Sequence, residues 1–160
     1  MIGRKEEFYT FRGYTLAQFE RDDLSPSMED YLEMIYRLSQ GDGFTRVNDL
    51  AQSLNVQPPS VTKMSQRLSM KGLIQYERYG VIVLTRLGRQ VGEYLFERHA
   101  MLEEFFRIIG VRQRLLENVE RIEHNLTPEA TQCLFQLVGF LQENPGIREQ
   151  FARYRGDMGG

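Results

Sequence analysis

The stretch VNDLAQSLNVQPPSVTKMSQRL, from Val47 to Leu68, decides the fold. Apolar residues recur at helical spacing in its first half, and the small residue Ala51 suits a close crossing of two helices. Leu54-Asn55-Val56 then makes a turn, and Pro58-Pro59 opens another helix because proline is tolerated in a first turn. Two short helices joined by a tight turn are typical of a helix-turn-helix.

A helix precedes this stretch, and a β-ribbon follows it. The upstream helix is predicted to begin at an N-cap at Ser27 and to end near residues 41–43; its apolar positions are Met28, Tyr31, Leu32, Ile35, Tyr36 and Leu38. Downstream, residues 73–77 and 81–85 predict two strands around a turn at residues 78–80. This order of elements predicts a winged helix-turn-helix with a two-stranded wing.

The rest of the chain is predicted to be helical. Apolar periodicity predicts a long helix over residues 87–109, which Gly110 ends. Three further helices are predicted, near residues 112–125, 128–142 and 146–154. The predicted fold class is therefore mainly α.

Composition excludes several classes of protein. Hydrophobic residues make up 41% of the 160 residues and charged residues 26%, as in ordinary globular proteins. No apolar run approaches a membrane span, so we expect no membrane partner. The single cysteine, Cys133, excludes an internal disulfide and fits a reducing cytoplasm. Its apolar neighbours predict a buried core residue.

Charge is distributed unevenly along a chain whose net charge is −2. Residues 45–90 contain seven basic residues against two acidic ones, a balance of +5, so the other residues carry −7. A basic helix-turn-helix joined to an acidic module favours nucleic acid as the partner. The alternative is a helical core with a solvated basic face.

The polar side of the helix that begins at Pro58 would face the DNA. Side chains of these kinds contact phosphates and base edges, and Arg78 at the tip of the ribbon would reach the backbone or a minor groove. The predicted DNA-binding residues are Gln57, Pro58, Pro59, Ser60, Thr62, Lys63, Gln66, Arg67 and Arg78.

A second stretch, VERIEHN from Val119 to Asn125, gathers possible metal ligands. Helix geometry places Glu120, Glu123 and His124 within an arc of roughly 100°. The other histidine, His99, is a further candidate and lies beside the apolar face of the long helix. Asp30 and Glu33 form an acidic pair at i and i+3 of the first helix and are candidates too.

Each of these candidates also has an ordinary structural explanation. Acidic pairs on helices are usually solvated, and a histidine beside an apolar stripe is usually a hydrogen-bonded core residue. Together the six residues would offer four carboxylates and two imidazoles, enough for a pair of divalent-metal sites. Spacing alone does not bring three helices together, so from the residues a metal site remains a hypothesis.

Five segments resemble the diphtheria-toxin-repressor family of metal-dependent transcription factors, and within it the manganese-responsive branch. They are SPSMEDYLEMIY (25–36), PPSVTKM (58–64), LIQYERYGVIVLT (73–85), ERHAMLEEFFRIIGV (97–111) and VERIEH (119–124). The resemblance spans residues 25–149 and implies a homodimer that represses genes for metal uptake. It also implies metal ligands at Asp30, Glu33, His99, Glu120, Glu123 and His124.

The donor types favour manganese. Iron-responsive members that resemble this chain place sulfur-containing residues at the positions of Asp30 and Glu120, whereas both are carboxylates here. Oxygen donors suit Mn²⁺, although Zn²⁺ and Co²⁺ rank above it in raw affinity. We expect one or two Mn²⁺ ions per protomer, with Fe²⁺, Co²⁺ or Zn²⁺ binding in vitro. An iron-responsive regulator of the same family is the alternative.

The expected function is metal-dependent repression of transcription in the cytoplasm. Metal would fix the dimer for binding to a palindromic operator in double-stranded DNA, with no catalysis and no small-molecule substrate. Two other functions are possible on the residues alone. A dinuclear metalloenzyme would use the same carboxylates, as in di-iron bundles, but the pattern occurs once here. A winged regulator of an organic ligand would leave them as ordinary polar surface.

The resemblance also predicts the domain organisation. We expect an N-terminal extension at 1–24, a winged helix-turn-helix at 25–86, a connecting helix at 87–110 and a helical metal-binding and dimerisation domain at 111–160. The small third domain of longer relatives is expected to be absent. The extension is rich in aromatic residues, which suit packing on the body or a reach toward DNA, with a mobile tail as the alternative.

Overall fold

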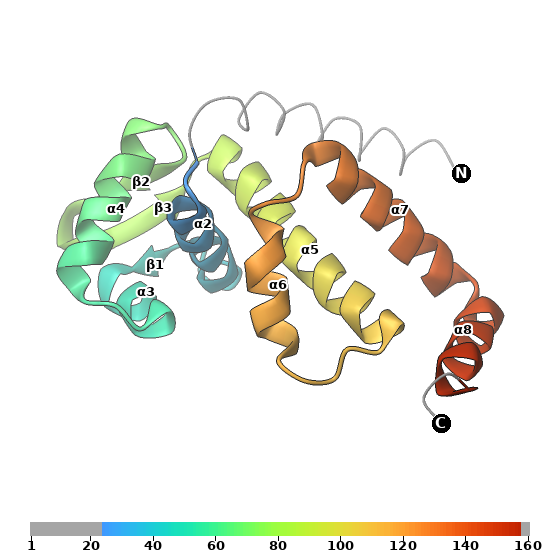
Figure 1. Cartoon of the computed structure of the whole chain (residues 1–160). Coiled ribbons are helices and arrows are strands. Elements are labelled where there is room, and N and C mark those ends of the chain that lie inside the picture. Colours follow the sequence, from blue (N-terminus) through green and yellow to red (C-terminus); the bar gives the residue numbers. More distant parts are fainter. Residues whose placement is uncertain (1–23, 158–160) are drawn as a thin grey trace. The chain divides into compact units, whose positions relative to one another are not determined.

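The computed structural model describes residues 24–157 (Figure 1). Within this range the chain divides into two compact units, with Phe96 the last residue of the first and Glu97 the first residue of the second. One helix, α5 (Arg86–Ile109), contributes residues to both. The N-terminal extension predicted at 1–24 lies, apart from Leu24, outside the described residues.

The first unit begins with α2 (Pro26–Leu38). Ser25 caps it, because its side chain accepts a hydrogen bond from the backbone N–H of Met28 at 3.3 Å, and Pro26 occupies the first turn. The N-cap predicted at Ser27 was therefore wrong by two residues, since proline suits the first helical position. The residues that α2 buries are those of its apolar stripe, Met28, Tyr31, Leu32 and Ile35.

Helices α3 (Val47–Leu54) and α4 (Pro58–Met70) form the helix-turn-helix. Asn55 ends α3 in the left-handed conformation, φ 53°, and the Val56 N–H reaches back to the Ala51 carbonyl at 3.0 Å. This turn lets the buried residues of α3 pack close to those of α4, which are Val61, Ser65 and Leu68. The predicted helix-turn-helix is confirmed.

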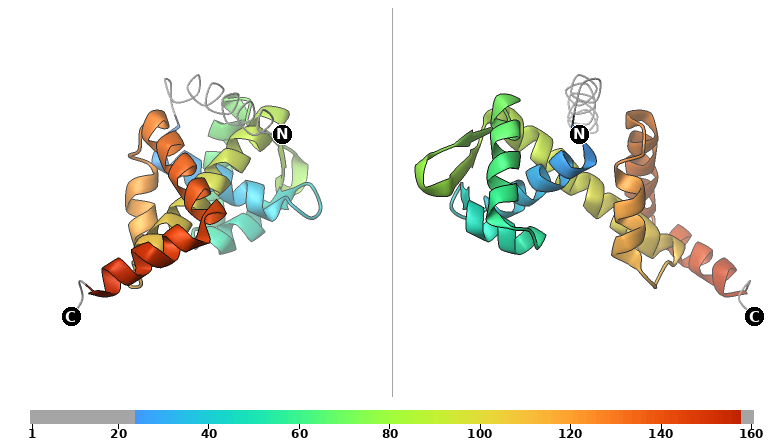
Figure 2. Two further views of the ribbon diagram at one scale, coloured as in Figure 1. Left: turned by 90° about the vertical axis from the view of Figure 1, so that its right-hand side faces the viewer. Right: turned by 60° about the vertical axis from the view of Figure 1, so that its left-hand side comes forward.

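Beside α4 lies a small antiparallel sheet with strand order β1-β3-β2. Its strands are β1 (Thr45–Arg46), β2 (Ile74–Tyr76) and β3 (Val81–Leu84). The hairpin of β2 and β3 extends as an arm beside α4 (Figure 2), with Tyr76 paired to Ile82. The short helical turn η1 (Arg78–Gly80) forms its tip. We predicted the two strands of the wing, and the structure adds β1 as a third strand. The sequence did not predict β1, because two residues are too few to show a periodic pattern.

Two glycines let α5 pack closely on the rest of the first unit. A Cβ on Gly88 would lie 1.7 Å from the Leu73 carbonyl oxygen, and one on Gly92 would lie 2.8 Å from the Tyr36 Cβ. Thr85 caps α5: its Oγ1 accepts from the Gly88 N–H at 3.0 Å and donates to the Gly72 carbonyl at 2.7 Å. The start of α5 is thereby fixed to the sheet and to α2.

The second unit contains the rest of α5 followed by α6 (Leu115–Glu123), α7 (Pro128–Glu143) and α8 (Pro145–Asp157). Its buried core consists of Met101, Leu102, Ile108, Val119 and Val138. The expected helix from residue 112 begins three residues later, because Arg114 takes the left-handed conformation, φ 53°. Gly110, at φ 89°, follows α5 as predicted.

The cysteine prediction was wrong. Cys133 is exposed on α7, on the side of the helix opposite to the buried Val138. Apolar residues occur on both sides of α7, so its apolar neighbours did not identify the inward face. Among residues 24–157 no helix combines the length and apolarity that crossing a membrane requires.

Candidate metal centre and nucleic-acid interface

Helix α6 buries one carboxylate, that of Glu123. The side chain follows Val119 by one turn on the inward face, and 3% of it is exposed. A buried carboxylate is costly unless charged or polar groups compensate it. Two imidazoles lie beside this carboxylate, so the second unit contains a small set of possible metal donors.

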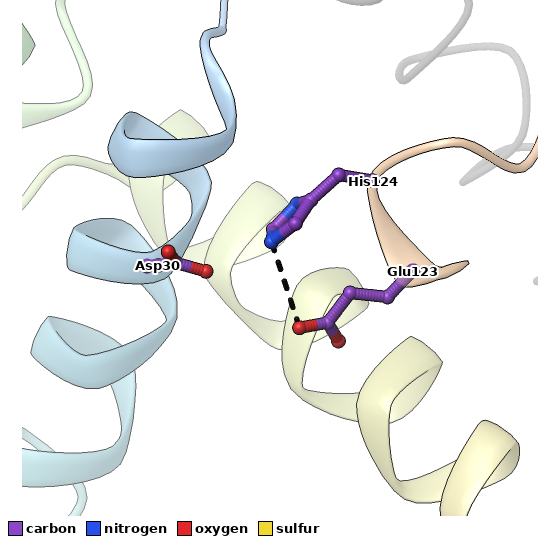
Figure 3. Close-up of side chains that lie close together, drawn as sticks. All are labelled: Asp30, Glu123 and His124. Atoms are coloured by element: carbon purple, nitrogen blue, oxygen red, sulfur yellow. Dashed lines mark ion pairs between the residues drawn. The ribbon is translucent and has the colours of Figure 1, made fainter. Parts of the chain in front are cut away.

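The two oxygens of Glu123 face different histidines. The Nδ1 of His99, on α5, lies 3.0 Å from Oε2, and the Nε2 of His124 lies 3.6 Å from Oε1. Figure 3 shows the His124 ring and the Glu123 carboxylate turned toward each other. Both imidazoles are about one-seventh exposed. A carboxylate with two imidazoles is a donor set that fits a divalent transition-metal cation.

Glu120 lies on the same helix but differs in exposure. It is one turn before Glu123 and His124, and its side chain is exposed to solvent. Of the four predicted ligands in the second unit, the structure therefore brings His99, Glu123 and His124 together. Glu120 precedes Glu123 by three residues and His124 by four, the helical spacing on which the prediction was based.

The remaining two predicted ligands, Asp30 and Glu33, lie in the first unit. They occupy i and i+3 of α2, on the side away from the buried stripe, with Asp30 exposed and Glu33 partly buried. Glu33 accepts two hydrogen bonds from Arg37 one turn later. Sequence reasoning missed Arg37, although its i+4 spacing from an acidic residue was a visible signal.

The DNA-binding residues predicted on α4 are accessible. Their side chains are exposed, apart from that of Thr62, which is half-buried. The first turn offers few backbone donors to an anion, because Pro58 and Pro59 lack N–H groups and the N–H groups of Ser60 and Val61 contact the Gln57 carbonyl, at 3.0 and 3.4 Å. Contacts to phosphate would therefore depend on side chains of α4 rather than on its helix terminus.

The tip of the wing presents two exposed side chains, Arg78 and Tyr79. Tyr79 is 92% exposed and adopts the left-handed conformation, φ 62°, which is unfavourable for a bulky residue. Sequence reasoning had named Arg78 but missed Tyr79. The only signal for it was its place beside Gly80 in the turn.

Family models match most of the chain. The model described as the iron dependent repressor, N-terminal DNA binding domain matches residues 23–82. The model described as the iron dependent repressor, metal binding and dimerisation domain matches residues 85–152. The first match contains α2, α3, α4 and β2 and ends within β3, and the second contains the buried Glu123 with both histidines.

Curated relatives agree with these matches. The HTH-type transcriptional regulator MntR of Lysinibacillus sphaericus is 44% identical over 124 residues, 77% of this chain and 89% of that protein. The regulator of the same name from Geobacillus kaustophilus is 46% identical over 121 residues, 75% of this chain and 86% of that protein. Both are named as regulators and not as enzymes, which supports the prediction that this chain is not an enzyme.

A solved structure shares the fold. The apo form of the manganese-activated repressor ScaR superposes with a TM-score of 0.57 at 28% identity, over 68% of this chain and 53% of the ScaR chain. The chain thus spans about half the length of that repressor. With most of its length matched by two domain models, the chain belongs to the iron-dependent repressor family, in which a DNA-binding domain precedes a metal-binding and dimerisation domain.

Proposed function

We propose that this chain is a manganese-responsive repressor that binds DNA as a homodimer. The observation that carries the proposal is the buried Glu123 carboxylate between His99 and His124, in a chain with relatives named MntR. We assign the winged helix-turn-helix to 25–86, the connecting helix to 87–110 and the metal-binding and dimerisation domain to 111–160. A DNA target and a lone thiol support a cytoplasmic location.

The proposed metal ligands are divided between the two units. Asp30 and Glu33 come from α2, and the other four from α5 and α6: His99, Glu120, Glu123 and His124. A pair of like charges about 4 Å apart costs about 4 kcal/mol at an effective dielectric constant of about 20. Four carboxylates in one site would therefore repel one another. One or two bound divalent cations would supply the positive charge that offsets this repulsion.

The donor chemistry supports manganese over softer metals. All six proposed ligands offer oxygen or nitrogen, and the chain's only thiol, Cys133, lies on α7 outside the set. Hard oxygen donors suit Mn²⁺, while Fe²⁺, Co²⁺ and Zn²⁺ are expected to bind in vitro. An iron-responsive repressor is the second candidate, which the description of the family favours.

Binding to DNA would follow from the arrangement that metal favours. The two recognition helices of a two-fold dimer must stand about one turn of DNA apart, or a multiple of it. Metal would act by binding more tightly to the DNA-competent arrangement of the dimer, so that arrangement becomes more populated. The side chains proposed to reach a palindromic operator are those predicted above on α4 and at Arg78.

The test measures fluorescence anisotropy of the gene's own upstream DNA at one fixed salt concentration. We expect tight binding with Mn²⁺ and weak binding with chelator. Fe²⁺ and Zn²⁺ should do little at the free concentration where Mn²⁺ saturates. Equal binding with chelator and metal would contradict the proposal, and a stronger response to Fe²⁺ would favour the iron-responsive candidate.

Glu123→Gln tests the site itself, because the amide keeps the size of the side chain and removes its charge. We expect it to lower Mn²⁺ affinity by more than about tenfold, since even substitutions next to ligands cost about 10–100-fold. The matched control is Glu117→Gln on the same helix, where the carboxylate is 34% exposed and pairs with Arg114 and Arg121. An equal effect of both substitutions would exclude Glu123 as a ligand.

A further inference from the structure

Arg37 forms an ion pair with the carboxylate of Glu33, a proposed metal ligand. Its Nε and Nη2 donate to the same oxygen of Glu33, Oε1, at 2.9 and 2.6 Å. The Glu33 side chain is 12% exposed and that of Arg37 is 38% exposed. A solvated i, i+4 pair of this kind is usually weak. Its importance here comes from what holds the guanidinium in place.

An aromatic cluster orders the Arg37 guanidinium. Its Cζ lies 5.2 Å from the centre of the Phe96 ring, within the range of a cation–π interaction. Phe96 in turn packs against Tyr36, with the ring centres 5.8 Å apart, and Tyr36 packs on α5 at Gly92. The guanidinium thus lies between a carboxylate and an aromatic face, both within the first unit.

We propose that Arg37 competes with the metal for Glu33 and so sets the free Mn²⁺ concentration at which the protein loads. The inference rests on the proposed function, because it requires Glu33 to be a metal ligand. A bound cation must either displace the guanidinium, losing the ion pair and the contact with Phe96, or share Glu33 with it. Sharing places a positive charge beside a divalent cation, so both cases lower metal affinity.

If Arg37 had a different role, its removal would change the Mn²⁺ affinity in the opposite direction. If Arg37 only held Glu33 in the orientation that metal requires, its removal would weaken metal binding by about 10–100-fold. If Arg37 competes, its removal strengthens binding. The direction of the change in Mn²⁺ affinity therefore separates the two roles.

The experiment measures Mn²⁺ binding to the purified chain without DNA, from the electron paramagnetic resonance signal of free Mn²⁺. Arg37→Met removes the charge and keeps an unbranched side chain. We expect it to tighten binding about tenfold, an advantage that should shrink as salt rises from about 0.05 to about 0.5 M. Arg37→Lys keeps the charge but loses one of the two hydrogen bonds and the planar contact with Phe96, so it should tighten binding less than Arg37→Met does.

Arg107→Met is the matched control. Arg107 pairs with Glu103 at the same i, i+4 spacing on α5, but Glu103 is not a proposed ligand. We expect this variant to bind Mn²⁺ like the parent. Circular dichroism of each variant establishes that a change in affinity does not come from unfolding.

Glu33→Gln separates failure of this inference from failure of the proposed function. If Glu33→Gln weakens Mn²⁺ binding while Arg37→Met weakens it or leaves it unchanged, the competition is wrong and the metal site stands. If Glu33→Gln has no effect, Glu33 is not a ligand, and the assignment of the site and the inference both fail. Tighter binding in Arg37→Met with weaker binding in Glu33→Gln supports both.

Discussion

The acidic residues of α6 differ from one another chiefly in burial. Glu117 is 34% exposed and pairs with two arginines, Glu120 is exposed, and Glu123 is 3% exposed. Placing a carboxylate inside the unit costs folding free energy, and two imidazoles lie beside that of Glu123. Such a placement is reasonable where a ligand repays the cost, since a cation that binds only the folded chain stabilises it.

Tyr31, on the buried face of α2, gives a prediction about alkaline pH. Burial raises the pKa of the Tyr31 hydroxyl above its ordinary value, because desolvation disfavours the charged phenolate. The resulting stability is fully present below the unfolded pKa of about 10 and is lost as pH rises through the folded pKa. Parent chain should therefore lose more stability than Tyr31→Phe above about pH 10.

Urea unfolding of both chains at several pH values between about 8 and 11 measures this difference. The matched control is Tyr79→Phe, which alters a ring that is 92% exposed and should follow the parent chain at every pH. Parallel curves for the parent and Tyr31→Phe would contradict the prediction.

The sequence named candidate ligands but gave little information about the groups that surround them. Glu120, Glu123 and His124 were grouped because residues at i, i+3 and i+4 share a side of a helix. The contact between Glu123 and His99 joins residues 24 positions apart, and periodicity carries no information about such pairs. Arg37 was missed for a similar reason: its i+4 partner was visible, but its contact with Phe96 depends on how α2 packs on α5.

At the scale of elements, the two prolines of α4 decide how it would meet DNA. They remove the backbone donors of the first turn, so the phosphate contacts fall to side chains such as Lys63, which is exposed on α4. Each lysine that contacts a phosphate contributes about one unit to the slope of log affinity against log salt concentration. We therefore expect Lys63→Ala to reduce that slope by about 1.

The measurement is anisotropy with saturating Mn²⁺ at several salt concentrations, on the operator and on an unrelated duplex. The loss should be similar on both, because a phosphate contact carries no sequence information. Arg112→Ala is the matched control, since Arg112 is exposed in the loop between α5 and α6. An unchanged slope in Lys63→Ala would remove this residue from the phosphate contacts.

Local signals predicted the elements well where they were strong. The bounds of α3 and α4 follow from turn chemistry at Asn55 and at the proline pair, so the sequence placed them correctly. The sheet was less predictable because β1 has two residues and pairs with β3 at Thr45 and Ile82. That pairing depends on tertiary structure and not on any alternation within β1 itself.

At the scale of the whole molecule, α7 and α8 present apolar surface that no other part of residues 24–157 covers. The exposed apolar residues of α7 lie opposite to its buried ones, and those of α8 follow an i, i+4, i+7 spacing. They are Cys133, Leu137, Phe140, Ile147, Phe151 and Tyr154. The periodicity of α7 predicted its helix correctly but did not tell which of its two apolar sides faces the core.

Helix α8 uses charged side chains as well as its neighbour α7 to pack in the second unit. Its contact with α5 is made by arginines: Arg148 lies 3.3 Å from Glu104, and the Arg155 guanidinium fills the space beside Gly110 where a Cβ would be. The apolar residues of α8, Ile147, Phe151 and Tyr154, lie on the neighbouring side of the helix and are exposed. Uncovered apolar patches of this kind mark interaction sites, and the family model for this region names it a dimerisation domain.

We expect Phe140→Asp to weaken the dimer by about a hundredfold or more in dissociation constant. Burial of a phenylalanine contributes about 1.5–3 kcal/mol, two-fold symmetry counts each substitution twice, and about 1.4 kcal/mol corresponds to a factor of ten. Sedimentation velocity across a range of concentrations measures this dissociation constant directly.

Gln132→Asp is the matched control, because Gln132 is exposed on α7 outside the apolar face and its substitution should leave the dimer intact. A Phe140→Asp chain that stays dimeric would place the interface elsewhere. A monomeric one that still binds Mn²⁺ but not its operator would show that DNA binding needs both recognition helices.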